Sequence, residues 1–141
     1  MAIDTLRSIR SPKITVTMEQ VDRARRSISS LMELDGAVEA AVGDMSTGLA
    51  LVMVGRSHPD EIDVAVAANS EVLRANIVAQ KLRNAAGSIR DVLVTLDDRV
   101  HILRPLRALQ HHFVYFAAER ERCNLAFARM RVSSAAESID L

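Results

Sequence analysis

The sequence predicts an α+β fold in which three helices cover a five-stranded, mostly antiparallel sheet. Three observations lead to this prediction. Three stretches carry apolar residues at helical spacing, five shorter apolar runs stand between them, and the connections between neighbouring runs are short. Because short connections join antiparallel strands, the expected order along the chain is α-β-β-α-β-β-β-α.

The length of 141 residues fits a single domain. Residues 1–16 are weakly patterned, and we expect a flexible N-terminal extension there, a folded domain over 17–132 and a C-terminal tail over 133–141. Apolar residues make up 49% of the chain but aromatic residues only 3%, so the core is expected to be aliphatic.

Composition also excludes several classes of function. Lys+Arg and Asp+Glu are equal at 18 each, which leaves no global field to attract nucleic acid. The single cysteine, Cys123, fits a reducing compartment, and no run approaches the roughly 18 apolar residues that span a bilayer. We therefore expect a cytoplasmic protein that neither binds nucleic acid nor inserts into a membrane.

The first helix is predicted to start at a capping box formed by Thr17 and Gln20, and to end at Gly36. Two apolar runs follow at 37–42 and 49–54, joined by a turn rich in Asp, Ser and Gly, and they predict a hairpin. Both runs are apolar on both faces, so each face is expected to be covered.

The central helix, residues 60–86, is predicted to have Ser57 as its N-cap and Gly87 at its C′ position. Its apolar residues form two offset stripes rather than one. The first stripe consists of Ile62, Ala65, Val72, Ala75, Ala79 and Leu82, and the second of Val66, Leu73 and Ile77. One stripe would cover the sheet and the other a second copy of the chain, although a helix buried on both sides within one monomer would show the same pattern.

Three more strands are expected at 91–96, 100–103 and 112–118, with the last in the middle of the sheet because it holds three of the four aromatic residues. The apolar run 91–96 would be an aggregation hazard as an open edge, and pairing it with its symmetry mate would remove the hazard. A third helix should start at the N-cap Asn124 and carry Leu125, Ala128 and Val132 inward.

The sequence holds no catalytic constellation, no metal-binding spacing among its four histidines and no glycine-rich phosphate loop. Cys123 lies in no motif that marks a nucleophile. The sequence therefore predicts no enzyme, no metal and no cofactor.

Several local motifs, in this order, resemble the roadblock/dynein light-chain (LC7-like) domain family in its bacterial form. They are residues 31–38 before the first strand, the turn at 44–48, the long Ala-rich second helix, residues 102–106 and residues 124–129. The resemblance implies a profilin-like, three-layer fold with the second helix on one face of the sheet and the first and last helices on the other. It also implies homodimers that pair their third strands and second helices, and a regulatory role toward small Ras-like GTPases or their signalling complexes.

Together with this resemblance, the sequence predicts two sets of site residues. The expected dimer interface is Ile62, Ala65, Val66, Val72, Leu73, Ala75, Ala79, Val92, Val94 and Leu96. The expected partner-binding residues are Glu71, Arg74, Lys81 and Arg104. Two other functions stay open: a small-molecule sensing domain, since profilin-like sheets also make sensors, and a purely structural adaptor.

Overall fold

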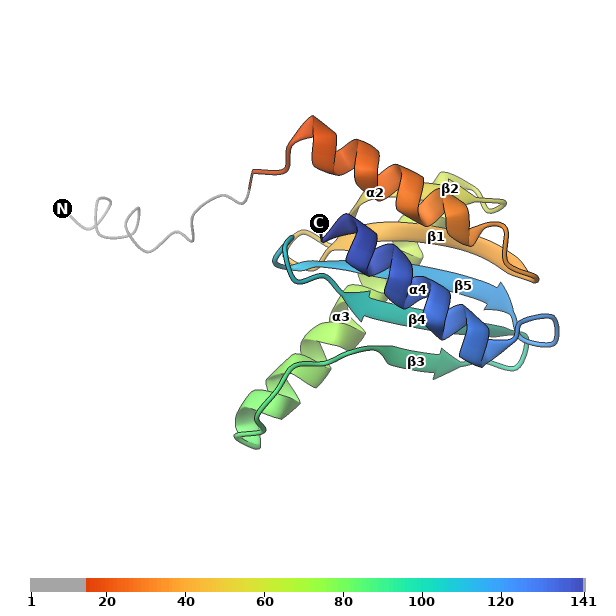
Figure 1. Cartoon of the computed structure of the whole chain (residues 1–141). Helices are drawn as coiled ribbons and strands as arrows, with labels where there is room; N and C mark the ends of the chain where they lie inside the picture. Colours follow the sequence, from red (N-terminus) through yellow and green to blue (C-terminus); the bar gives the residue numbers. More distant parts are fainter. Residues whose placement is uncertain (1–14, 141) are drawn as a thin grey trace.

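The computed structural model describes residues 15–140 (Figure 1). The N-terminal extension predicted over 1–16 lies almost entirely outside these described residues. Of the two that are described, Val16 packs against the hydrophobic core together with Val21.

The described residues form three helices and five strands in the predicted order. The elements are α2 (Met18–Leu31), β1 (Ala37–Asp44), β2 (Leu49–Gly55), α3 (Pro59–Leu82), β3 (Val92–Thr95), β4 (Arg99–Pro105), β5 (His112–Glu119) and α4 (Leu125–Ile139). All neighbouring strands are antiparallel, in the order β2-β1-β5-β4-β3, which confirms that the aromatic-rich strand is central.

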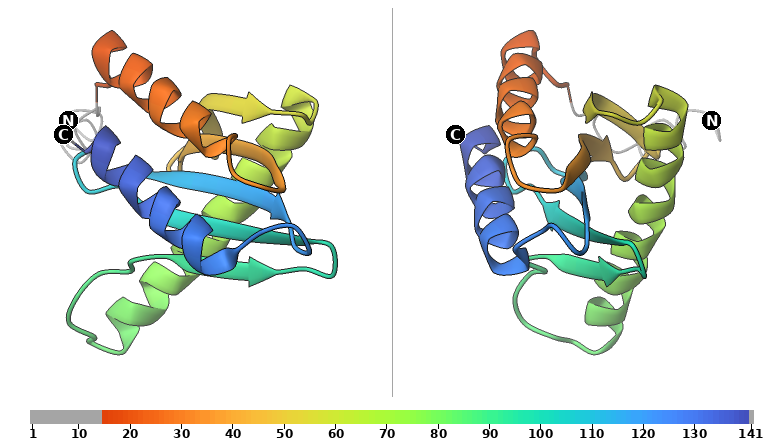
Figure 2. Two further views of the ribbon diagram at one scale, coloured as in Figure 1. Left: turned by 45° about the vertical axis from the view of Figure 1, so that its right-hand side comes forward. Right: turned by 90° about the vertical axis from the view of Figure 1, so that its right-hand side faces the viewer.

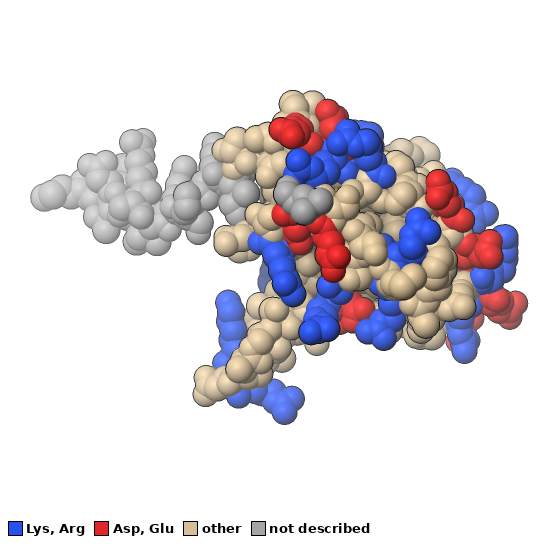
Figure 3. All heavy atoms as spheres, viewed as in Figure 1, with Lys and Arg blue, Asp and Glu red and all other residues tan. Residues whose placement is uncertain are grey.

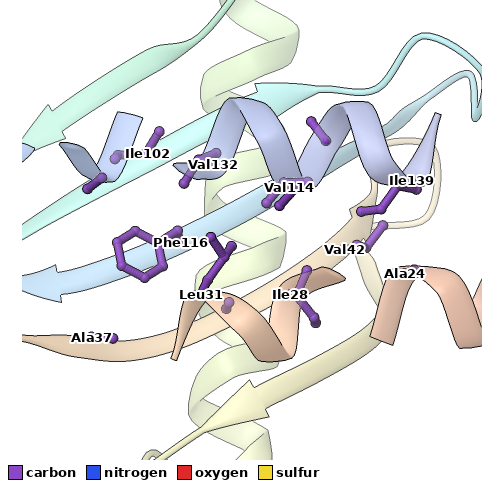
Figure 4. Close-up of a cluster of buried hydrophobic side chains, with 14 of the residues drawn as sticks. Ala24, Ile28, Leu31, Ala37, Val42, Ile102, Val114, Phe116, Val132 and Ile139 are labelled. Atoms are coloured by element: carbon purple, nitrogen blue, oxygen red, sulfur yellow. The ribbon is translucent and has the colours of Figure 1, made fainter. Parts of the chain in front are cut away.

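The sheet is the middle of three layers, with α2 and α4 on one face and α3 alone on the other (Figure 2). This arrangement confirms the predicted fold class. A large hydrophobic cluster fills the space between this face of the sheet and the helices α2 and α4. Figure 4 shows part of it, with Ile28 and Leu31 from α2, Val132 and Ile139 from α4, and Phe116 from β5.

The predicted tail after residue 132 is wrong, because α4 continues to Ile139. Ala135, Ala136 and Ile139 continue the helical spacing of Val132 and are buried. The serines and charged residues between them occupy the outer face of the helix and hide this spacing in the sequence. Asp140 then anchors the end by accepting hydrogen bonds from the backbone N–H groups of residues 107 and 108 at 2.9–3.2 Å.

The caps of the helices agree with the prediction only in part. The capping box of Thr17 and Gln20 is present and confirms the start of α2, but α2 ends at Leu31, five residues before Gly36. Gly36 instead adopts a positive φ of 79° in the turn that leads into β1. Asn124 caps α4 as predicted, by accepting from the N–H of Phe127.

The predicted caps of α3 are both wrong. His58 is the N-cap and its Nδ1 accepts from the N–H of Asp60, while the Ser57 hydroxyl is drawn into the sheet by Glu39. At the other end Asn84, with φ 51°, takes the left-handed position expected of Gly87. The N–H groups of Asn84 and Ala85 donate to the carbonyls of Lys81 and Gln80, which is the Schellman pattern.

The expectation that both strands of the first hairpin are covered on both faces holds for β1 only. Every residue of β1 from Ala37 to Gly43 is buried, whereas β2 forms one edge of the sheet and is largely half-buried or exposed.

Candidate functional site

The outer face of α3 carries an apolar stripe that no described residue covers. Its large members are Val64, Val78 and Leu82, which are 70%, 47% and 80% exposed. Small residues at helical spacing complete it, and we call the whole set the α3 stripe: Val64, Ala68, Ala75, Val78, Ala79 and Leu82. Glu71, exposed and paired with Arg74, divides the stripe into Val64 and Ala68 on one side and Ala75 to Leu82 on the other. An exposed apolar surface such as the longer part marks a contact with another molecule.

The α3 stripe lies beside a free edge of the sheet. β3 pairs only with β4 among the described strands, so its outer backbone groups have no partner strand there. Val92 and Val94 are half-buried, and Leu93 and Leu96 are exposed. The last residue of α3 buried in the core is Leu73, and the rest of the helix runs past β3 and projects beyond the sheet (Figures 1 and 2).

Three of the residues predicted for the dimer interface lie elsewhere. Ile62, Val66 and Leu73 are buried against β1 and β5 in the core on the α3 side of the sheet, and cannot touch a second chain. They were assigned wrongly because the apolar residues of α3 surround most of its circumference, so spacing alone does not say which face meets the sheet.

The remaining predicted interface residues stay accessible to different degrees. Ala65 and Val72 are both half-buried and pack against the core on the α3 side of the sheet. Ala75 and Ala79 are exposed and belong to the α3 stripe. Val64 and Val78 were missed. The signal was present, since the face opposite Ile62, Val66 and Leu73 contains both valines and Leu82 at helical spacing.

The predicted partner-binding residues do not form one surface. The Arg74 guanidinium is 2.6 Å from the Glu71 carboxylate and also donates to the backbone carbonyl of Met45, so it is tied to its own chain. Lys81 is exposed at the projecting end of α3. Arg104 lies on β4 toward α4, where it lines a pocket with Glu137 and Asp140, away from the other three.

The projecting part of α3 and the following loop carry only positive charge. Residues 72–90 include Arg74, Lys81, Arg83 and Arg90 and no Asp or Glu. Figure 3 shows this end of the molecule with blue side chains and no red ones. Beneath the helix end, Ile77, Ala85, Ile89 and Pro105 contribute to an apolar groove of about 270 Å³. An acidic partner with an apolar contact surface matches this chemistry.

A buried carboxylate fixes the start of α3 to the sheet. Glu39 on β1 is only 2% exposed, and it accepts from the hydroxyls of Ser57 and Tyr115 at 2.5 and 3.0 Å. The Arg99 guanidinium lies 3.7 Å from the Glu39 carboxylate and supplies the opposite charge. Burial, together with the negative charge of Glu39, raises the pKa of the Tyr115 phenol well above its ordinary value. The phenol therefore stays protonated and remains a donor to Glu39.

None of the described histidines, cysteines or carboxylates come together in a group of three that would hold a metal ion. His101 packs edge-on against the Tyr115 ring at 5.4 Å, and burial lowers its pKa. His112 is buried, with Nδ1 2.9 Å from the carbonyl of Gln110. Burial raises the pKa of the Cys123 thiol, which disfavours the reactive thiolate.

No model of a known protein family matches the sequence, and no curated protein matches it. Solved structures do match, and they show that the chain has a roadblock/LC7-like domain fold.

One is a roadblock/LC7 domain from Streptomyces avermitilis, with a TM-score of 0.71 and 21% identity, over 82% of this chain and 92% of that one. Another is the gliding protein MglB from Thermus thermophilus, with a TM-score of 0.75 and 15% identity over 93% and 96% of the two chains. A third is MglB in a tetrameric arrangement, with a TM-score of 0.75 and 16% identity over 93% and 95% of the two chains.

None of the helices in the described part of the chain combines the length and the apolar character that crossing a membrane requires.

Proposed function

We propose that this chain is a non-enzymatic, homodimeric regulatory module that binds a small Ras-like GTPase or its signalling complex. The observation that carries the proposal is the apolar α3 stripe next to the unpaired edge of β3. Both features are unfavourable in water, and one two-fold contact would cover both.

In the proposed dimer β3 pairs with the β3 of a second copy, which extends the sheet across the two-fold axis. The projecting end of each α3 then lies over the other copy's sheet, near the side chains of Val92 and Val94 that its own helix leaves half-exposed. Ala75 and Ala79 allow the two helices to approach closely, and Val78 and Leu82 supply the buried apolar area. The tetrameric MglB structure supports self-association as a property of this fold.

The GTPase part of the proposal rests on the resemblance to bacterial roadblock domains, on the similarity in fold to MglB, and on the charge of the helix end. A cationic and apolar surface suits an acidic partner surface. In this proposal an effect on hydrolysis would come from ordering the GTPase's own catalytic groups rather than from an arginine finger. Arg74 on α3 is already bonded to Glu71 and Met45.

Size-exclusion chromatography with light scattering tests the dimer. The wild-type chain should elute at twice its mass of 15.5 kDa, and Ala75→Glu should shift it toward the monomer. Ala126→Glu is the matched control, because it places the same charge at an exposed position on α4, on the other face of the sheet. A monomeric wild type, or equal behaviour of the two variants, would refute this part of the proposal.

Titration with purified Ras-like GTPases from the source organism, loaded with GTP or GDP, tests the partner. A regulator changes the rate of nucleotide hydrolysis, whereas a structural adaptor binds without changing it. Failure of every such GTPase to bind a dimeric wild type would reject the partner but leave the dimer standing.

A further inference from the structure

A second cationic surface lies on the opposite side of the molecule, between α2 and α4. It is a groove of about 410 Å³ lined by residues of these two helices. We call it the α2–α4 groove, and its lining residues are Arg23, Arg26, Ser27, Ser30 and Ser138. Figure 3 shows blue side chains gathered over α2 on this side.

The lining is cationic and polar, with no acidic member. Arg23 pairs at 3.3 Å with Glu19, which lies at the start of α2. Arg26 is exposed and makes no ion pair with any residue that the structure describes. Arg131 extends the positive charge, since its guanidinium donates to the carbonyl of Ser30 at 3.3 Å and makes no ion pair with a described carboxylate. The groove therefore offers guanidinium groups to an anion, whereas the Ser30 hydroxyl already donates to the carbonyl of Ser27.

Beside the groove, α4 carries exposed apolar side chains. The Arg131 guanidinium lies 5.9 Å from the centre of the Phe127 ring, and Phe127 is 45% exposed. Met130 on the same helix is 56% exposed. A ligand that follows the groove past Arg131 thus meets an exposed aromatic and a flexible thioether, which favour an apolar side chain.

We propose that the α2–α4 groove binds a short acidic segment of a partner protein, with its carboxylate or phosphoserine groups on Arg23, Arg26 and Arg131 and an apolar residue on Phe127. Guanidinium groups hold carboxylate and phosphate oxygens in paired hydrogen bonds, which gives the contact direction as well as charge. The 14 residues of α2 span about 21 Å, enough for roughly six residues of an extended segment.

The charges around the groove favour a protein segment over an anionic membrane. Asp22 and Glu137 are exposed on α2 and α4, and a flat anionic surface laid over both helices would be repelled by their carboxylates. A narrow peptide contacts less of the two helices than such a surface does. The whole chain has a formal net charge of zero, so the attraction is local to the groove.

Binding at this groove does not depend on the proposed function. The groove lies on the face of the sheet opposite α3, so it remains open in a monomer and in the proposed dimer alike (Figure 2).

Fluorescence polarisation of the full-length chain with a labelled peptide Glu-Asp-Glu-Glu-Asp-Leu, and with its phosphoserine counterpart, tests the proposal. Arg26→Glu should weaken binding at least about tenfold, because it places a like charge in the groove. Arg25→Glu is the matched control: it makes the same charge change one residue away, outside the lining, and should change affinity less than about twofold. Phe127→Ala should weaken the binding of the peptide that ends in Leu more than the binding of a peptide that ends in Ser.

The proposal fails if neither peptide binds the wild type, or if Arg25→Glu and Arg26→Glu weaken binding equally, since general charge would then explain the attraction. It also fails if phosphatidylserine vesicles bind in an Arg26-dependent way and the peptides do not. Circular dichroism of each variant confirms that it is folded before it is compared.

Discussion

The two faces of the sheet are built in different ways. Among the described residues, twenty buried residues form the cluster under α2 and α4, whereas nine form the one under α3. Two helices that pack on each other seal the first face, and a single helix covers part of the second before it runs past β3 (Figure 2). A helix longer than the layer it covers therefore leaves apolar surface for another molecule.

The largest expected change in the free energy of unfolding comes from the sheet face covered by α2 and α4. Phe116→Ala removes a fully buried aromatic ring from the central strand and should lower the free energy of unfolding by about 3–5 kcal/mol. Chemical denaturation followed by circular dichroism measures it. Phe127→Ala removes the same side chain from an exposed position on α4 and should cost less than about 0.5 kcal/mol. Similar losses for the two variants would mean that this face is not the main core.

The next effect contrasts the two halves of α3. Leu73→Ala empties a buried site and should cost about 2–5 kcal/mol. Leu82→Ala makes the same change at an 80% exposed position, and should leave the unfolding of the monomer unchanged within about 0.5 kcal/mol. In the proposed dimer, however, Leu82→Ala should weaken self-association, which dilution in analytical ultracentrifugation measures. A large loss of monomer stability from Leu82→Ala would contradict the division of α3 into a covered and an uncovered half.

A smaller effect concerns the polar centre of the α3 face. Tyr115→Phe removes one hydrogen bond from the buried carboxylate of Glu39 and should lower the free energy of unfolding by about 1–3 kcal/mol at neutral pH. Urea denaturation of the variant and the wild type measures the difference. An unchanged unfolding midpoint would mean that the Tyr115 hydroxyl contributes nothing to holding Glu39.

The same residue predicts a pH dependence. The ordinary pKa of tyrosine is 10.0 and burial raises that of Tyr115 in the folded chain. The protonated phenol is therefore favoured by folding, and its contribution is complete below about pH 10 and is lost as the pH rises above that value, by up to about 1.4 kcal/mol per pH unit. Because Tyr115 is the only tyrosine, phenolate absorbance follows it directly. A native protein whose phenol titrates near pH 10 would contradict this account.

The smallest effect tests whether the projecting end of α3 is ordered. Asn84 adopts φ 51°, which alanine tolerates less well, so Asn84→Ala should cost about 1 kcal/mol and speed hydrogen exchange in the last turn. Asn84→Gly, which suits this conformation, should be neutral or slightly stabilising. If neither variant changes exchange there, the Schellman end of α3 is not formed in solution.

Much of the fold could be predicted because each element carries its own local signal. The Thr17–Gln20 box marks the start of α2, and the concentration of aromatic residues places β5 in the centre of the sheet. Local signals failed where two candidates competed. Ser57 and His58 are both able to cap α3, and the choice was made by Glu39, a residue 18 positions away that draws the Ser57 hydroxyl into the sheet.

The candidate site was predicted less well than the fold. The two-sided character of α3 and the edge position of residues 92–96 were evident from their composition, but Ile62, Val66 and Leu73 were placed on the wrong side. The α2–α4 groove was not predicted at all, because Arg23, Arg26 and Ser138 come together only when two helices separated by the whole sheet pack side by side.

The sequence by itself determined the number, type and order of the elements, because periodicity and capping act within a few residues. Only the tertiary structure decided which face of α3 is buried. A helix with apolar residues on opposite sides has no single preferred face of its own, and its rotation is set by Tyr115 and the other side chains of the sheet on which Ile62, Val66 and Leu73 pack. That choice of rotation is what leaves Val64, Val78 and Leu82 exposed.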